Sequence, residues 1–459
     1  MLLQFICNCK KMVTMNTRSR QSFITAIATS FGFAVHFTAP LSAGDSTPLN
    51  PPAQEAAISD QSLLDSLSFS DANLGGFLFP HFHALGAFGD TTGNQESLAQ
   101  GHHDPQTDAT LQALHPGMSL RAGMLQGFAT ANGYTDAHGH FNFVLEEGFL
   151  KLVDLPLGIQ LRGGQFYNRF GFQNSLHNHG WMFVDQNLVN GRFLNEGELG
   201  TIGGEVSIDV PLSMMQASVL SVAVGGLPSH GHGHDHGHEH GDHEEAEFEA
   251  EGANFTNTLV TAAWVNQYDI NDMNRITGIF SGAWGDNEFG RTTQVYGVGF
   301  EYLWRENGYG AGGQSVRWRN ELMYRDLGGV SGHLHEEEEH DEHGHADEDE
   351  EEHDHHEEEH EHDEERRYAS FDEFGLYSTM IYGLNEHWEA GARAGWVSGI
   401  SEMGLDDRFR LSPMITWYAN SARTLQARLQ YNWDHSDDFG SEHSVWFQVG
   451  LNFGGPEVR

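Results

Sequence analysis

Two tracts of the chain alternate histidine with acidic residues and glycine. The first holds seven histidines, and the second, from His333 to Glu365, holds ten histidines and twenty carboxylates. Neutral imidazole binds zinc, copper and nickel, and carboxylates can complete the coordination shell. We expect weak, multi-site binding of zinc, with nickel and copper as the other candidates, because a flexible backbone imposes no rigid geometry. The predicted ligands are His230, His232, His234, His236, His238, His240, His243, His333, His335, His340, His343, His345, His353, His355, His356, His360 and His362.

A second candidate metal site lies in the segment that begins at His177. His177 and His179 are two residues apart, and on an extended backbone such residues point to the same side. With Asp185 they predict a better-defined metal site. Trp181 and Phe183 would fold this segment inward as a constriction. The alternative is a structural loop whose histidines bind backbone groups.

Catalytic arrangements are not indicated. Asp434, His435 and Ser436 are neighbours in the sequence, but a catalytic triad is defined by its geometry in space. Glu146 and Glu147 are adjacent, and adjacent residues of a strand point to opposite faces, so we expect that they cannot act together. The sequence therefore predicts no enzyme and no catalytic residue, and the predicted metal ions are weakly bound rather than required cofactors.

Charge and the N-terminal region narrow the function classes. The net charge is −43 with no basic patch, which argues against a nucleic-acid partner. Residues 1–43 resemble a secretory signal peptide, because four basic residues precede an apolar stretch and the small-residue site that ends at Ala43. Residues 44–73 read as a linker with one short helix. Both cysteines, Cys7 and Cys9, lie within the predicted leader.

The rest of the chain, residues 74–459, alternates polar and apolar residues with a period of two. Such alternation, with aromatic residues at strand ends, is typical of a transmembrane antiparallel β-barrel in the outer membrane of a Gram-negative bacterium. The alternative is a soluble β-fold. We predict about sixteen strands, near residues 74–88, 106–115, 118–129, 141–153, 158–166, 200–210, 215–225, 255–266, 274–284, 292–304, 315–325, 371–383, 387–397, 408–418, 424–433 and 443–453.

Strand parity places the long connections on one side of the predicted barrel. Short turns belong on the periplasmic side and long loops outside the cell. The His-rich tracts then fall in two external loops, 226–254 and 326–370. His81 and His83 form an inward-facing pair on the first strand, and His115 is expected to be an ordinary residue of a turn. The predicted pore-lining residues are Arg162, Arg317, Arg319, Glu321, Arg325, Glu389, Arg393 and Arg428.

The most distinctive stretch is 141–210. It contains Glu146-Glu147-Gly148-Phe149-Leu150, the run from Leu155 to Phe166, and His177-Asn178-His179-Gly180-Trp181-Met182-Phe183-Val184-Asp185-Gln186. It resembles the bacterial family labelled zinc-regulated, TonB-dependent outer-membrane receptors, which are porin-like barrels with His-rich insertions. The resemblance implies a link to zinc. Energised gating is not expected, because a plugged transporter has about 22 strands and a large plug domain.

These patterns lead to one functional prediction and two alternatives. We expect a porin-like channel whose His-, Asp- and Glu-rich external loops capture divalent metal, zinc above all, for uptake. The alternatives are a surface metal-buffering protein without transport and a general porin for small solutes. The expected partners are divalent metal ions and the lipid of the outer membrane, and a homotrimer is predicted.

Overall fold

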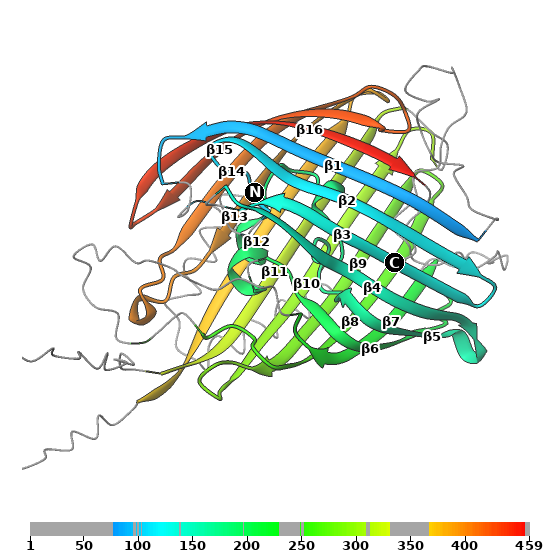
Figure 1. The fold of residues 1–459 in the computed structure, drawn as a ribbon, viewed down its shortest axis with the longest axis horizontal. Helices are drawn as coiled ribbons and strands as arrows, with labels where there is room; N and C mark the ends of the chain where they lie inside the picture. Colours follow the sequence, from blue (N-terminus) through cyan, green and yellow to red (C-terminus); the bar gives the residue numbers. More distant parts are fainter. Residues whose placement is uncertain are drawn as a thin grey trace, which may run out of the picture. The chain divides into compact units, whose positions relative to one another are not determined.

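A computed structural model describes residues 77–454, except 95–97, 99–100, 102, 137–138, 196, 229–247, 249–251, 309–312 and 331–366. Sixteen antiparallel strands form one closed barrel (Figure 1). Each strand pairs with its neighbours in the sequence, and β1 closes the ring against β16. The predicted fold class and strand number are therefore confirmed. The predicted leader and linker lie outside the described residues.

The strand bounds follow the predicted order. They are β1 (Leu78–Thr91), β2 (Asp108–Ala122), β3 (Leu125–Thr135), β4 (Phe141–Leu155), β5 (Ile159–Tyr167), β6 (Gly200–Asp209), β7 (Ala217–Gly226), β8 (Thr258–Asn271), β9 (Asn274–Asp286), β10 (Thr292–Arg305), β11 (Ser315–Val330), β12 (Tyr368–Gly383), β13 (Trp388–Val397), β14 (Arg408–Tyr418), β15 (Leu425–Ser436) and β16 (Gly440–Gly454). One short helix, α5 (Leu188–Phe193), and the 3-10 turns η1 (Pro156–Gly158), η2 (Asn178–Gly180) and η3 (Ser401–Met403) complete the described elements.

The two faces of the barrel wall differ as the alternation predicts. On β6, Ile202 and Val206 face outward and are about half exposed, whereas Glu205 and Ser207 are buried inside. An apolar exterior around a closed ring of strands suits hydrocarbon, because no backbone group at a sheet edge is left unpaired. The chain is thus an outer-membrane barrel. Among the residues that the structure describes, no helix has the length and apolar character needed to cross a membrane.

The longest connections follow odd-numbered strands and therefore lie at one end of the barrel. They are 92–107, 168–199, 227–257 and 331–367. The short turns lie at the other end, which in such barrels is the periplasmic end. The ends of β7 and β11, where both tract-bearing connections begin, lie at the same end of the barrel as the other long connections. The tracts' predicted ligands, His230 to His243 and His333 to His362, lie outside the described residues.

One predicted turn is wrong. Strand β2 continues through His115, Pro116 and Gly117, and the chain turns at Gly123 instead, where φ is 62°. Proline is tolerated in a strand only where no ladder hydrogen bond needs its missing N–H. The Pro116 carbonyl, and with it the ring nitrogen, points toward β3, and the pairing of β2 with β3 begins only at Gly117. His115 is consequently a buried residue of the barrel wall rather than a turn residue.

Candidate metal centre in the barrel lumen

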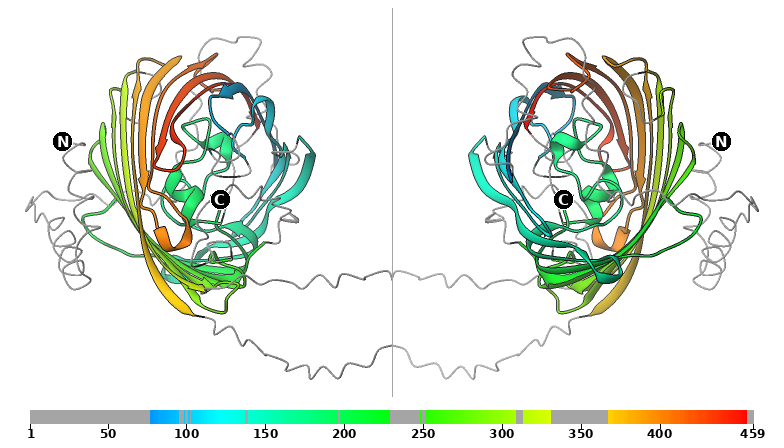
Figure 2. Two further views of the ribbon diagram at one scale, coloured as in Figure 1. Left: turned by 90° about the vertical axis from the view of Figure 1, so that its left-hand side faces the viewer. Right: turned by 90° about the vertical axis from the view of Figure 1, so that its right-hand side faces the viewer.

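The connection between β5 and β6, residues 168–199, folds into the barrel. Figure 2 looks along the barrel and shows this segment, with helix α5, inside the ring of strands. We call it the inner segment. Trp181 and Phe183 are both buried, which agrees with the inward constriction predicted from the sequence. Asn187 begins α5 as its N-cap, accepting a hydrogen bond from the Asn190 N–H, which satisfies one free donor at the helix start.

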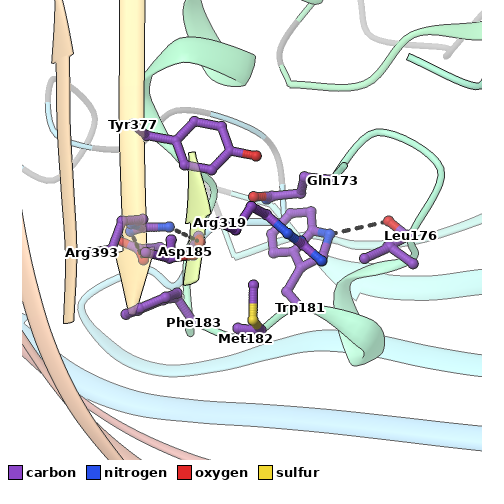
Figure 3. A pocket seen from close by; sticks show the side chains of 10 residues that line it. Gln173, Leu176, Trp181, Met182, Phe183, Asp185, Arg319, Tyr377 and Arg393 are labelled. Atoms are coloured by element: carbon purple, nitrogen blue, oxygen red, sulfur yellow. Dashed lines mark hydrogen bonds and ion pairs between the residues drawn. The ribbon is translucent and has the colours of Figure 1, made fainter. Parts of the chain in front are cut away.

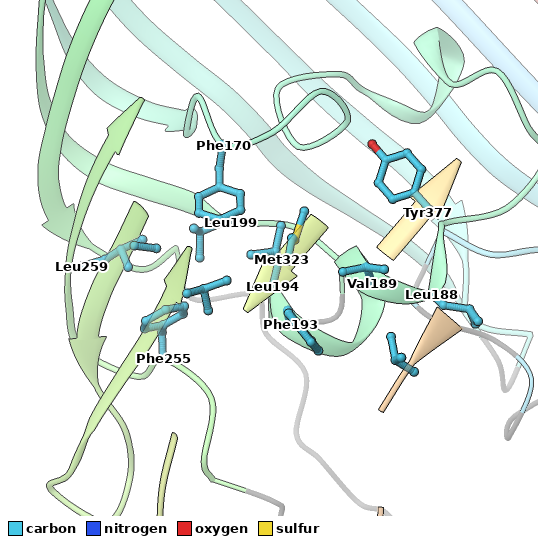
Figure 4. Packing of buried hydrophobic residues seen from close by; sticks show 13 residues of the cluster. Phe170, Leu188, Val189, Phe193, Leu194, Leu199, Phe255, Leu259, Met323 and Tyr377 are labelled. Atoms are coloured by element: carbon cyan, nitrogen blue, oxygen red, sulfur yellow. The ribbon is translucent and has the colours of Figure 1, made fainter. Parts of the chain in front are cut away.

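An apolar cluster holds one side of the inner segment to the barrel wall. Phe193 and Leu194 are fully buried at the end of α5 (Figure 4). The cluster combines inner-segment residues Phe170, Leu188, Val189, Phe193, Leu194 and Leu199, Phe255 of the connection between β7 and β8, and wall residues Leu259, Ala283, Val295, Met323, Tyr377 and Val397. Each buried side chain of this size contributes about 1.5–3 kcal/mol relative to exposure. This half of the lumen is therefore a packed core.

A buried carboxylate anchors the other side of the inner segment. Asp185 accepts hydrogen bonds from Arg393 (2.5 Å) and Arg410 (2.9 Å), two guanidinium groups of the wall (Figure 3 shows Arg393). Gln430 and Asn432 add two more, at 2.6 and 2.9 Å. Burial alone would raise the pKa of Asp185, but the two guanidinium groups outweigh it and hold the pKa below its usual range. The prediction that Asp185 binds metal is therefore wrong, because its oxygens are occupied by these four wall side chains.

The two predicted histidines of the inner segment meet a third histidine from the wall. His115, His177 and His179 can each offer one ring nitrogen, all within 4.8 Å of one another. His115 Nδ1 lies 3.1 Å from His179 Nδ1, and His115 Nε2 lies 2.9 Å from a Glu146 oxygen. His177 Nε2 lies 3.0 Å from a Glu147 oxygen. A carboxylate behind a ligating imidazole is the usual outer-shell arrangement of a zinc site.

A β-bulge explains why both glutamates reach this place. Glu147 pairs with Thr130 and Leu145 with Ala131, so Glu146 is the extra residue of β4. A bulge reverses the facing of the residues beyond it. Glu146 and Glu147 are consequently both buried in the lumen, at 4% and 2% exposure. The expectation that they point to opposite faces is wrong for this reason.

A second group of possible ligands lies beside the first. His103, Glu146 and Glu198 each offer an atom within 4.8 Å of the others. His103 Nε2 lies 3.4 Å from a Glu198 oxygen and 4.0 Å from a Glu146 oxygen. The Tyr167 hydroxyl lies within hydrogen-bond distance of oxygens of Glu146 (3.0 Å) and Glu198 (2.5 Å). All three candidate ligands are buried, so this group belongs to the interior and not to the rim.

The predicted pair on the first strand lies close to the three histidines. The His83 ring stacks on the His179 ring with 3.8 Å between centroids, and the His81 ring lies 5.8 Å from that of His83. His83 Nδ1 is 3.0 Å from the Asn452 amide oxygen on β16. His81 pairs with Gly454, the last residue of β16, so the two histidines lead toward the short-turn end of the barrel.

The predicted pore-lining arginines and glutamates lie on the inner face but are engaged in contacts with each other and with the inner segment. Arg162 binds Glu205 at 2.6 Å and Arg319 binds Glu301 at 2.7 Å. Arg325 binds Glu373, Arg393 binds Asp185, Glu389 binds Arg423, Glu321 accepts from Tyr377, Arg317 lies 3.9 Å from Glu301, and Arg428 donates to Gln448 and to the Trp181 carbonyl. Most of these charges thus face an opposite charge of the wall or of the inner segment, whereas Arg428 and Glu321 have neutral hydrogen-bond partners.

A small pocket remains between the inner segment and strands β11 to β13. Its cavity volume is about 10 Å³, and it is drawn in Figure 3. Trp181, Met182 and Phe183 line one side, and Arg319, Tyr377 and Arg393 line the other. The pocket has room for about one water molecule. Its arginines are those already paired with Glu301 and Asp185.

Sequence reasoning missed His103, His115, Glu146, Glu147 and Glu198 as members of this site. His115 was hidden by the turn signal of Pro116 and Gly117, and the glutamates by the assumption of strict alternation through β4. A signal was present, since two adjacent acids in an otherwise alternating strand can mark a bulge.

Comparison with known proteins gives limited additional information. No family model matches the chain. A curated protein of Aquifex aeolicus (strain VF5), described as uncharacterized, is 34% identical over 86 residues, and the match spans 18% of each chain. Solved structures with a similar arrangement include an anion-selective porin from Comamonas acidovorans (8% identity, 82% of this chain and 98% of that chain, TM-score 0.45). The outer-membrane channel DcaP of Acinetobacter baumannii (8%, 82% and 96%, TM-score 0.43) and a trimer form of OmpT of Vibrio cholerae (8%, 82% and 98%, TM-score 0.42) are also similar.

Proposed function

We propose that this outer-membrane barrel is a channel for the uptake of divalent metal, with zinc as the cargo. The observation that carries the proposal is the group of three imidazoles formed by His115, His177 and His179 inside the lumen. Imidazole nitrogen is a preferred zinc ligand, and tetrahedral zinc with Zn–N distances of about 2.0–2.1 Å places its ligand atoms about 3.3 Å apart. Small movements of the rings from their present separations reach that geometry.

The composition of the surroundings supports zinc over a softer or harder ion. Both Glu146 and Glu147 lie within hydrogen-bond distance of a histidine of the group. Carboxylates there can serve as a fourth ligand or orient the rings. The mature chain is expected to have no thiolate, which disfavours copper(I), and an all-oxygen shell as magnesium prefers is not available at three histidines.

The His-rich tracts complete the proposed route. In the sequence the tracts lie between β7 and β8 and between β11 and β12, and their histidines and carboxylates would raise the local concentration of divalent cations outside the cell. The tracts would capture metal weakly, and the lumenal histidines would bind it in a defined geometry. A homotrimer stays a prediction.

Zinc flux into liposomes tests the proposal. Purified wild-type barrel is reconstituted with an internal zinc indicator and compared with H177Q/H179Q, which removes two of the three imidazoles. The matched control is H435Q/H443Q, two exposed histidines of β15 and β16. We expect zinc flux to fall at least tenfold in H177Q/H179Q and to be unchanged in the control. Equal flux in both variants would favour a general porin, and absence of flux in the wild type a buffering protein.

A further inference from the structure

The two groups of candidate ligands are joined by one residue. Glu146 presents one carboxylate oxygen to His115 Nε2 at 2.9 Å, and its other oxygen lies 4.0 Å from His103 Nε2 and 3.0 Å from the Tyr167 hydroxyl. A carboxylate has two oxygens and can bridge two cations. The β4 bulge directs Glu146 into the space between the two groups.

We propose that the lumen holds two cation sites that share Glu146, an inference that rests on the proposed function. The first site also contains His103 and Glu198, and the second contains His115, His177 and His179. Zinc passes from the first site to the second. The first site is rich in oxygen ligands and the second in nitrogen ligands. Zinc accepts both ligand types, so neither step excludes it.

The placement of the sites along the barrel gives the sequence of binding. His103 belongs to the connection between β1 and β2 at the outer end, and its ring packs against Tyr134 near the end of β3. His115 lies farther along β2 toward the short-turn end, opposite His83 of β1. From there the rings of His83 and His81 continue to the last residue of β16. The ligands thus form a file along the β1–β4 wall.

Charge favours occupation of this file by cations. Glu146, Glu147 and Glu198 are all at least nine-tenths buried and lie close together. Burial disfavours ionised carboxylates, and a divalent cation between them compensates that cost. Shared ligands also keep a bound ion from being held too tightly, because a second cation entering at His103 repels the first, and conduction requires that an ion can leave.

Binding stoichiometry tests the proposal without reference to transport. The protein lacking residues 229–247 and 333–365 is titrated with zinc by calorimetry, so that the tracts contribute nothing. We expect two ions per chain, one ion in H103Q/E198Q and one ion in H177Q/H179Q. The control E442Q/H443Q removes one exposed histidine and one adjacent glutamate, and should retain two ions.

Three outcomes separate the two proposals. A single bound ion in the protein without tracts overturns the shared site. It leaves the proposed function standing, provided that binding of this ion is lost in H177Q/H179Q. No bound ion overturns both. Two ions with zinc flux unchanged in H103Q/E198Q overturns the transfer between sites. The expected result is two bound ions in the protein without tracts. In H103Q/E198Q we expect zinc flux to fall at least tenfold while potassium conductance is unchanged. An unfolded barrel would lose the potassium conductance as well.

Discussion

The Asp185 anchor predicts how firmly the inner segment is held in the lumen. In D185N the side chain keeps its size but loses its charge, and its amide N–H₂ would face donors from Arg393, Arg410, Gln430 or Asn432. Asp185 now accepts four side-chain hydrogen bonds, two of them from buried guanidinium groups. Removing one partner of a buried ion pair costs about 3–5 kcal/mol. Since about 1.4 kcal/mol corresponds to a factor of ten, the released form of the segment should gain two to three orders of magnitude in population.

Thiol labelling measures that population directly. Val184 is fully buried beside the anchor, and the only cysteines of the sequence, Cys7 and Cys9, lie in the predicted leader. V184C in a chain without those two cysteines therefore carries one thiol, which a membrane-impermeant reagent reaches only when the segment opens. The labelling rate should rise at least 100-fold in D185N/V184C. The control is D437N/V184C, which removes an exposed carboxylate. A change of less than threefold in D185N/V184C would refute the account of the anchor.

Three further predictions concern the packing, the outer face and the tracts. F193A removes the buried side chain at the end of α5 and should destabilise the docked inner segment by about 3–5 kcal/mol. Limited proteolysis at residues 168–199 should become faster. Equal proteolysis rates would show that the apolar cluster does not hold the segment. Phe280 lies on the outward face at the middle of β9, and F280R should lower the free energy of unfolding by about 2–4 kcal/mol, measured by urea-dependent refolding into bilayers. F280L is the control. A loss below about 1 kcal/mol would contradict a lipid-facing position. Deletion of 229–247 and 333–365 should leave the thermal unfolding temperature within a few degrees, because the longer connections add little to the entropy of loop closure. Most of the weak zinc capacity should disappear. A barrel that fails to fold would show that the tracts have a structural role.

The barrel was predictable from the sequence because membrane strands repeat a two-residue rule many times. A single error in one strand, such as the turn placed at Pro116, does not change the number of strands when the true turn follows a few residues later. Inward placement of the arginines followed from the same rule. Their partners did not, because an ion pair such as Arg393 with Asp185 joins residues 208 positions apart.

The candidate metal centre was only half predictable. His177 and His179 were predicted together from their spacing on an extended backbone. The structure instead brings them together through the 3-10 turn η2. His115 and Glu146 depend on where β2 turns and where β4 bulges, and a single sequence leaves both features ambiguous. Asp185 was assigned to the metal site because it is near the histidines in sequence, whereas its contacts are set by wall strands from the other end of the chain.

The seam between β1 and β16 has a consequence for biogenesis. His83 and Asn452 are 369 residues apart and meet across it, so this contact forms only after the last strand has been made. Until β1 and β16 pair, the sheet is curved but not closed, and the inner segment can reach the interior through the gap between these two strands. Afterwards, entry would require passage through the ring's outer mouth. Two routes are therefore open to the segment that carries His177 and His179. It can dock through the open side before the first and last strands pair, or through the mouth of the closed ring afterwards.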